Sequence, residues 1–206
     1  MKQLLILTGP QGSGNHLWSK IFALHPQVSG WRALLDTYWI GHDQEPFAEY
    51  WADPARLPMY NWRTADWHVT SMSVPYMNNG TATVPDFKSF VREAQNSGVK
   101  VKFAVLGRDR NIVEMQQQRV RGGITLPQAL AEFAPFANPV FLSYELLHLY
   151  GVKYLETVAK QLEFPIAIND PRLTAILSED TNAKYFVPVT YHTTDDLAKH
   201  SSRKHK

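Results

Sequence analysis

The sequence predicts an α/β fold, a three-layer sandwich with a central parallel sheet. Short apolar segments at residues 2–8, 99–106 and 139–143 have the character of buried strands, and helix-like segments separate them. Strands that alternate with helices form parallel sheets joined by right-handed crossovers. The first strand runs directly into a glycine-rich loop, so the binding edge of the sheet is expected where that strand ends.

Local signals place the other elements. A helix over residues 15–24 follows the loop and ends before Pro26, because the residue before a proline is disfavoured in a helix. Asp86 is typical of an N-cap, and Ser97-Gly98 of the end of the helix that Asp86 begins. By the same reasoning we expect a strand over 66–72, helices over 111–121 and 125–133, and a long amphipathic pattern over 146–162.

Composition indicates a globular protein without a redox or metal centre. The 206 residues include no cysteine, and the eight histidines are too scattered for a zinc pattern, so we expect no metal. The formal net charge of +2 is carried entirely by the residues from 193 onward, which leaves a neutral body and argues against nucleic-acid binding. No apolar stretch is long enough to span a membrane, so we expect a cytoplasmic protein.

We expect a single domain over residues 1–192, followed by a basic tail over 193–206. Residues 30–76 form an aromatic-rich insertion within that domain and hold five of the six tryptophans. Such rings either line an acceptor pocket or build a small second core. We favour the second interpretation for most of them, with a few rings at the pocket.

The segment from Gly9 to His16 carries the main functional signal. Its glycines at 9, 12 and 14 allow positive φ and close backbone approach, and polar side chains follow at the point where a helix begins. This pattern predicts an oxyanion site, although a tight turn that needs glycine for steric reasons alone gives the same pattern. The lysine that usually handles a γ-phosphate is absent, so the loop indicates a nucleotide but not an ordinary ATPase.

Arg108 is the second candidate for phosphate binding. It follows the strand over 99–106, and open α/β sheets bind ligands at the carboxyl ends of their strands. The planar guanidinium makes bidentate, charge-assisted hydrogen bonds with phosphate. A salt bridge across the sheet edge is the alternative role.

Three segments, in the same order along the chain, resemble the sulfotransferase family. Residues 5–18 are similar to its 5′-phosphosulfate-binding loop and first helix. Residues 103–113 are similar to the strand that ends in Arg-Asp-Pro or Arg-Asn-Pro, whose arginine holds the 3′-phosphate of the donor. Residues 140–147 are similar to the strand that ends in Tyr-Glu-Asp-Leu. The compact size resembles that of bacterial or phage-encoded members.

The resemblance implies a P-loop NTPase-like sulfotransferase fold and a transferase activity. The donor would be 3′-phosphoadenosine 5′-phosphosulfate (PAPS), which leaves as adenosine 3′,5′-bisphosphate (PAP). The acceptor would be a hydroxyl or amine on a small molecule or glycan, with no metal required. We expect a monomer or homodimer that binds neither nucleic acid nor membrane. Residues implied in donor binding are Gly12, Ser13, Gly14, Asn15, His16, Arg108 and Gln116.

Two of these positions depart from the family pattern. Gly12 stands where the family has a lysine or arginine, whose charge stabilises the oxygen that bridges phosphate and sulfate. Gln116 stands where a serine contacts the 3′-phosphate, and its amide is still a donor. The two departures therefore leave the groups expected to bind the nucleotide in place and remove a charge that the family uses in catalysis.

The catalytic residues expected from the sequence are His68 and His16. His68 lies in a segment that resembles the Lys-Thr-His strand of the family, which suggests a general base, but a buried structural histidine gives the same pattern. His16, if protonated, could replace the charge missing from the loop. Carboxylates that could replace His68 as the base, without any spacing that selects one, are Asp36, Asp43, Glu45 and Glu49.

Two other functions fit parts of the sequence. A P-loop nucleotide or small-molecule kinase fits less well. The loop lysine is absent, and Arg108 follows the strand over 99–106 at a place where a kinase is expected to have a magnesium-binding acid. A non-catalytic nucleotide-binding module that has lost its loop cation fits the substitution at Gly12.

Overall fold

The computed structural model describes residues 2–37, 40–78 and 80–179, and the structural statements below concern these residues. The basic tail expected over 193–206 lies outside the described residues, as do two aromatic residues of the insertion, Tyr38 and Trp39.

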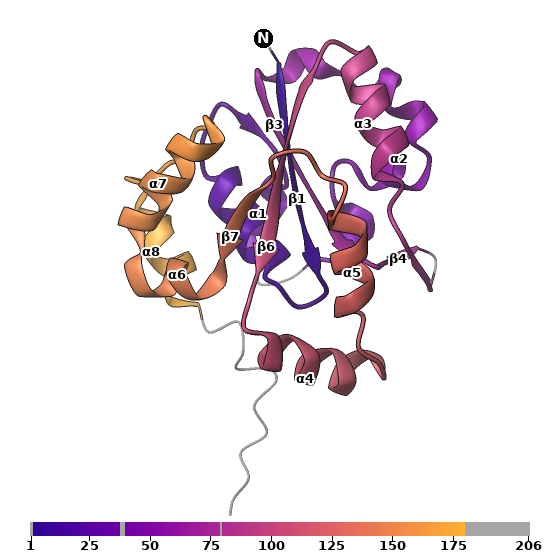
Figure 1. Ribbon diagram of the computed structural model, residues 1–206. Helices are drawn as coiled ribbons and strands as arrows, with labels where there is room; N and C mark the ends of the chain where they lie inside the picture. Colours follow the sequence, from indigo (N-terminus) through magenta and orange to yellow (C-terminus); the bar gives the residue numbers. More distant parts are fainter. Residues whose placement is uncertain (1, 38–39, 79, 180–206) are drawn as a thin grey trace, which may run out of the picture.

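A five-stranded parallel sheet in the described residues forms the centre of the molecule, in the order β2-β3-β1-β6-β7 (Figure 1). Its strands are β1 (Gln3–Pro10), β2 (Val28–Ser29), β3 (Trp67–Val74), β6 (Lys100–Gly107) and β7 (Val140–Ser143). A small antiparallel pair, β4 (Tyr76–Asn78) and β5 (Thr81–Thr83), extends from the end of β3.

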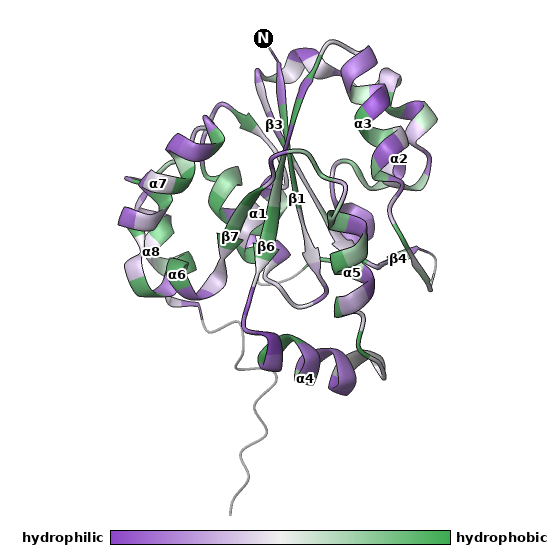
Figure 2. Ribbon diagram, viewed as in Figure 1, coloured by the Kyte–Doolittle hydropathy of each residue, from purple (hydrophilic) through white to green (hydrophobic). Residues whose placement is uncertain are grey.

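Helices cover both faces of the sheet, which confirms the predicted three-layer α/β fold (Figure 1). One face carries α1 (Asn15–Ala23), α6 (Tyr144–Tyr150), α7 (Val152–Leu162) and α8 (Pro171–Ser178). The other carries α2 (Ala48–Ala52), α3 (Phe87–Asn96) and α5 (Leu126–Phe133). Helix α4 (Arg110–Arg121) lies beyond the carboxyl end of β6, and Figure 2 shows it largely in the hydrophilic colour.

Strand β1 separates two hydrophobic cores. Its side chains alternate between the faces, as the two-residue period of a strand requires, so Leu5 and Leu7 join the core under α1, while Leu4 and Ile6 join the core under α3. All four side chains are fully buried. A strand buried on both faces is continuously apolar, which is why residues 4–7 carry no polar alternation.

The aromatic insertion packs largely into the core under α3. The Trp51 ring stacks on Phe90 of α3 with centroids 3.7 Å apart, and Phe47 stacks on Tyr60 at 4.4 Å. The insertion also contains four short 3₁₀ turns: η1 (Arg32–Asp36), η2 (His42–Gln44), η3 (Pro54–Met59) and η4 (Trp62–Thr64). The rings of the insertion therefore mainly cover one face of the sheet, and the insertion expected over 30–76 includes β3, a strand of the central sheet.

Two features of the described chain differ from the sequence expectations. The amphipathic pattern over 146–162 is two helices rather than one, because Gly151 adopts a positive φ of 51° between α6 and α7. Strand β2 has only two residues and was not anticipated from the pattern; it is defined by its pairing with Trp67 and His68 of β3.

Candidate functional site

The loop after β1 and the segment after β6 meet at the point where the sheet changes the direction of its connections. From β1 the chain turns to α1 on one face, and from the neighbouring β6 it continues through α4 to α5 on the other face. Open parallel sheets bind ligands in the crevice at such a switch point, outside the carboxyl ends of the strands. The geometry therefore places the candidate site between the ends of β1 and β6.

The loop leads directly into the N-terminus of α1. Gly12 and Gly14 have φ values of 93° and 102°, a region that favours glycine, and Gly14 is the N-cap of the helix. The first intrahelical hydrogen bond runs from the Trp18 N–H to the Gly14 carbonyl at 3.1 Å, so the N–H groups before Trp18 lie at the positive end of the helix dipole. This backbone arrangement suits an anion.

Side chains of the loop are turned inward and hold its shape. The Ser13 hydroxyl donates to Asn15 Oδ1 at 3.2 Å, and the Asn15 amide donates to the Ser71 hydroxyl on β3 at 3.1 Å. Ser13 is fully buried and Asn15 is 5% exposed. Both were expected to contact a donor nucleotide; in this arrangement their side chains attach the loop to β3, and the Ser13 N–H donates to the Pro10 carbonyl at 3.1 Å.

Helix α4 lies against the other side of the loop through two adjacent glutamines. The Gln117 amide donates to the Gln11 carbonyl at 2.8 Å, and its oxygen accepts from the Thr125 N–H at 2.8 Å. The Gln116 side chain lies over Gly12, where a Cβ would come within 2.9 Å of Gln116 Oε1. Gln116, expected to contact the 3′-phosphate of a donor, thus lies next to the loop, and Gln117 is a loop contact that the sequence analysis missed.

Arg108 reaches the loop from the end of β6. Its Nη1 donates to the Gly12 carbonyl at 3.2 Å, and its guanidinium lies over the Tyr144 ring, 4.2 Å from the centroid. Asp109, next in the chain, caps α4 by accepting from the Ile112 N–H at 3.1 Å, and its own N–H donates to Glu145 Oε1 at 2.7 Å. Arg108 and the loop are therefore brought together, 96 residues apart in the sequence.

Two hollows adjoin Arg108 and Glu145. One, of about 510 Å³, lies against β7 and α7 and includes Phe141 and Tyr154 in its lining. The other, of about 420 Å³, is lined by α4, α6 and the end of α8: Arg108, Ile112, Tyr144, Glu145, His148, Leu177, Ser178 and Glu179. Both Arg108 and the Tyr144 ring that its guanidinium covers line the second hollow.

His16 lies beside the loop, but its ring is directed toward the insertion. Its Nε2 donates to the Ile40 carbonyl at 2.9 Å, since a carbonyl only accepts. The ring centroid lies 5.1 Å from that of Trp31 and 4.7 Å from that of His42. His16 thus joins an aromatic group at the first turn of α1.

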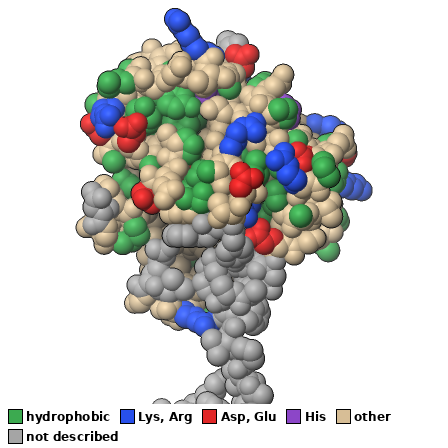
Figure 3. All heavy atoms as spheres, turned by 180° about the vertical axis from the view of Figure 1, so that it is seen from behind, with side chains coloured by type: hydrophobic (Ala, Val, Ile, Leu, Met, Phe, Trp, Pro, Cys, Tyr) green, Lys and Arg blue, Asp and Glu red, His purple; other side chains and the backbone are tan. Residues whose placement is uncertain are grey.

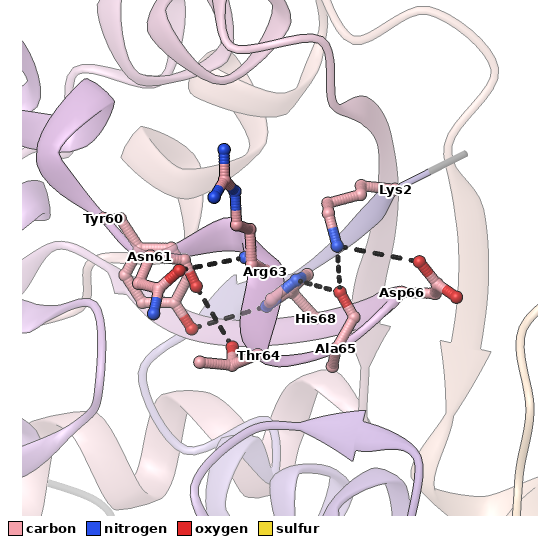
Figure 4. A network of polar contacts seen from close by, with 8 residues as sticks. All are labelled: Lys2, Tyr60, Asn61, Arg63, Thr64, Ala65, Asp66 and His68. Carbon is pink, nitrogen blue, oxygen red and sulfur yellow. Dashed lines mark hydrogen bonds and ion pairs between the residues drawn. The ribbon is translucent and has the colours of Figure 1, made fainter.

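The structure does not bring His68 to the loop. His68 pairs with Leu4 in the parallel register, five residues before Gly9, which is about 16 Å along a strand. Figure 4 shows its ring enclosed by Tyr60 and the turn that precedes β3. Nε2 donates to the Ala65 carbonyl at 3.0 Å and Nδ1 accepts from the Tyr60 hydroxyl at 3.4 Å. Both ring nitrogens make hydrogen bonds, and burial lowers the pKa of the ring. His68 therefore lies near the amino ends of the strands, whereas the loop follows the carboxyl end of β1.

Of the four carboxylates left open as bases, Glu45 alone is buried in the interior; Asp36, Asp43 and Glu49 are exposed. Its two oxygens accept from the Phe47 N–H at 2.8 Å and the Ser71 N–H at 3.3 Å. Burial raises the pKa of Glu45 to about 8, against the opposing effect of these hydrogen bonds. Through Ser71, Glu45 is connected to Asn15 and the loop.

Charges elsewhere on the described surface are mixed. On the face opposite to the view of Figure 1, lysine and arginine side chains stand beside acidic ones (Figure 3). Ion pairs of this kind join Lys2 to Asp66 at 3.6 Å and Arg56 to Glu49 at 2.8 Å. Within residues 2–37, 40–78 and 80–179, no group of three or more histidines and carboxylates is arranged to hold a metal ion. The helices of that same part of the chain include none that is long and apolar enough to cross a membrane.

No family model and no curated protein matches the sequence. Among solved structures, the chain is similar to mouse sulfotransferase SULT7A1 in complex with PAP, with a TM-score of 0.45 and 12% identity over 98% of this chain and 82% of that one. It is also similar to the tunicamycin resistance protein of Deinococcus radiodurans, with a TM-score of 0.47 and 16% identity over 81% of this chain and 99% of that one.

Proposed function

We propose that the chain binds a phosphorylated adenine nucleotide at the switch point and is a sulfotransferase with PAPS as its donor. One observation carries the proposal: the glycine loop at the N-terminus of α1 and the Arg108 guanidinium meet, with Nη1 3.2 Å from the Gly12 carbonyl. Backbone N–H groups, a helix dipole and a guanidinium at one point favour a multiply charged phosphate. The resemblance of three segments to sulfotransferases selects the donor.

In this proposal the loop receives the 5′-phosphosulfate, and the hollow beside Tyr144 receives the nucleoside. The hollow opens next to Arg108, and its lining includes an aromatic ring, aliphatic side chains and polar groups, the mixture that nucleoside sites use. Of the two histidines expected to act in catalysis, the proposal retains His16, whose ring lies at the first turn of α1. His68 is left out because it lies at the other edge of the sheet.

Titration with PAP tests the binding half of the proposal. Calorimetry of the full chain should give a saturable heat, and the melting temperature should rise with PAP concentration, because a ligand of the folded state stabilises it by mass action. No heat and no shift at millimolar PAP would refute donor binding.

A transfer assay with PAPS and a panel of phenols, amines and sugars tests the catalytic half. Release of PAP that depends on an acceptor supports a sulfotransferase. PAP binding without transfer to any acceptor supports a non-catalytic module instead, the alternative suggested by Gly12 in the cation position. Turnover of ATP with magnesium, and none of PAPS, would support the kinase alternative.

A further inference from the structure

We infer that Arg108 supplies the cation that the loop itself lacks, and that it binds the phosphate held by the loop rather than the 3′-phosphate. This inference rests on the proposed function and deepens it, because it assigns Arg108 to one phosphate of the nucleotide. The sequence resemblance alone assigns this arginine to the 3′-phosphate.

Gly12 does not accommodate a cationic side chain in this loop. Its φ of 93° lies in the left-handed region, where an L residue is strained. A Cβ at this position would also meet the Gln116 amide at 2.9 Å. The backbone conformation therefore favours glycine at residue 12, and the Gln116 amide, at the end of a flexible side chain, would have to shift for a Cβ to fit. The compensating charge is therefore assigned to another element.

Arg108 is held at the place where that charge is needed. The Gly12 carbonyl accepts from Nη1, and the Tyr144 ring supports the face of the guanidinium at 4.2 Å. Gly12 is exposed, so the crest of the loop is open to a ligand. A phosphate oxygen is a stronger acceptor than a carbonyl, so an anion in the loop would draw the guanidinium from Gly12.

The cationic candidates on α1 are directed elsewhere. The Lys20 ammonium pairs with Glu179 at 2.9 Å, and His16 donates to the Ile40 carbonyl at 2.9 Å. Arg108 instead donates to the loop itself. The loop and its cation then come from two separate strands, β1 and β6, whose ends are adjacent in the sheet.

Calorimetry with two probes, AMP and PAP, separates the two roles of Arg108. If Arg108 binds the loop phosphate, Arg108→Gln lowers the affinity for AMP and the affinity for PAP by the same factor. The expected factor is about 10- to 100-fold, the range for hydrogen bonds to a charged group. The conservative variant Arg108→Lys keeps the charge but loses the planar fork, so it should show a smaller loss that is again equal for both nucleotides. The matched control is Arg110→Gln, because Arg110 is exposed and pairs with Glu114 on α4; it should leave both affinities within about twofold.

A loss for PAP with unchanged AMP affinity would overturn the inference, because it would assign Arg108 to the 3′-phosphate. Unchanged affinity for both nucleotides in Arg108→Gln would also overturn it. Failure of the wild-type chain to bind either nucleotide would instead refute the proposed function, so the two failures are distinguishable. Thermal melting of each variant checks that it is folded, and Arg108→Lys keeps the comparison possible if Arg108→Gln is not.

Discussion

The Gln117 amide on α4 donates to the Gln11 carbonyl in the loop, and the same side chain accepts from the Thr125 N–H, each at 2.8 Å. A single buried side chain thus joins the loop after β1 to the turn that begins α5. The two bonds use both ends of an amide, so a hydrocarbon of similar size cannot replace it.

We therefore expect Gln117→Leu to lower the free energy of unfolding by about 1–3 kcal/mol, because it leaves a carbonyl and an N–H without their partner. Urea unfolding with an unchanged slope measures the loss. Gln118→Leu is the matched control, since Gln118 is the next residue of the same helix and is exposed; its stability should stay within about 0.5 kcal/mol of wild type. Equal stability of the two variants would show that the hydrogen bonds of the Gln117 side chain contribute nothing to the free energy of unfolding.

A lysine placed in the loop should be unfavourable. Gly12→Lys restores the residue type that sulfotransferase loops carry at this position, yet the positive φ should lower the free energy of unfolding by about 1–2 kcal/mol. Gly122→Lys shares the strain, with a φ of 73°, but has open space around it. If urea unfolding shows that Gly12→Lys lowers the free energy of unfolding more than Gly122→Lys does, the difference measures the cost of displacing the Gln116 side chain. Unchanged or higher stability of Gly12→Lys would contradict the strain.

Sequence reasoning located the loop and Arg108 because both signals are local. Glycine spacing after an apolar strand indicates an anion loop, and a strand end indicates the binding edge of a parallel sheet. Among the three consecutive glutamines 116–118, the resemblance indicates Gln116, whereas no local signal indicates Gln117. Successive residues of a helix point about 100° apart, so only the way α4 lies on the loop decides that Gln116 and Gln117 face it while Gln118 faces solvent.

The placement of His68 shows the opposite case. Its strand was predicted correctly, and the parallel sheet already implied that a residue near the start of that strand lies at the amino edge, away from the loop. The resemblance of a short segment to the Lys-Thr-His strand therefore does not indicate where that segment lies relative to the loop. Glu45 escaped selection for another reason: its burial depends on the packing of Phe47 and β3, which no spacing in the sequence records.

Glu45 should make stability fall as the pH rises. Burial raises its pKa from 4.5 to about 8, so between these values the folded state holds a proton that the unfolded state has released. Its contribution is fully present below pH 4.5 and is lost as the pH rises toward 8, with a slope of up to about 1.4 kcal/mol per pH unit.

The matched variant is Glu45→Gln, which removes the titration whatever its absolute stability. The difference in unfolding free energy between wild type and Glu45→Gln, measured in urea from pH 5 to pH 8, should change steadily in favour of the variant. The difference also cancels the effect of His68, whose lowered pKa acts in the opposite direction below its ordinary value. A pH-independent difference would show that Glu45 is ionised throughout this range.

His68 should matter for stability and not for the candidate site. His68→Ala removes a fully buried ring that lies against Tyr60 and Trp62, with centroids 5.6 Å and 5.0 Å away, and that accepts from the Tyr60 hydroxyl. We expect the free energy of unfolding to fall by about 2–4 kcal/mol, the range for large-to-small core substitutions.

The affinity of His68→Ala for PAP should stay within about twofold of wild type, because the ring is about 16 Å from the loop along the strand. His16→Ala is the comparison for catalysis, since His16 lies at the first turn of α1 and is the histidine that the proposed function retains: its loss should slow sulfate transfer more than the loss of His68 does. A slower transfer rate in folded His68→Ala, with His16→Ala unaffected, would reverse these assignments and return His68 to the reaction.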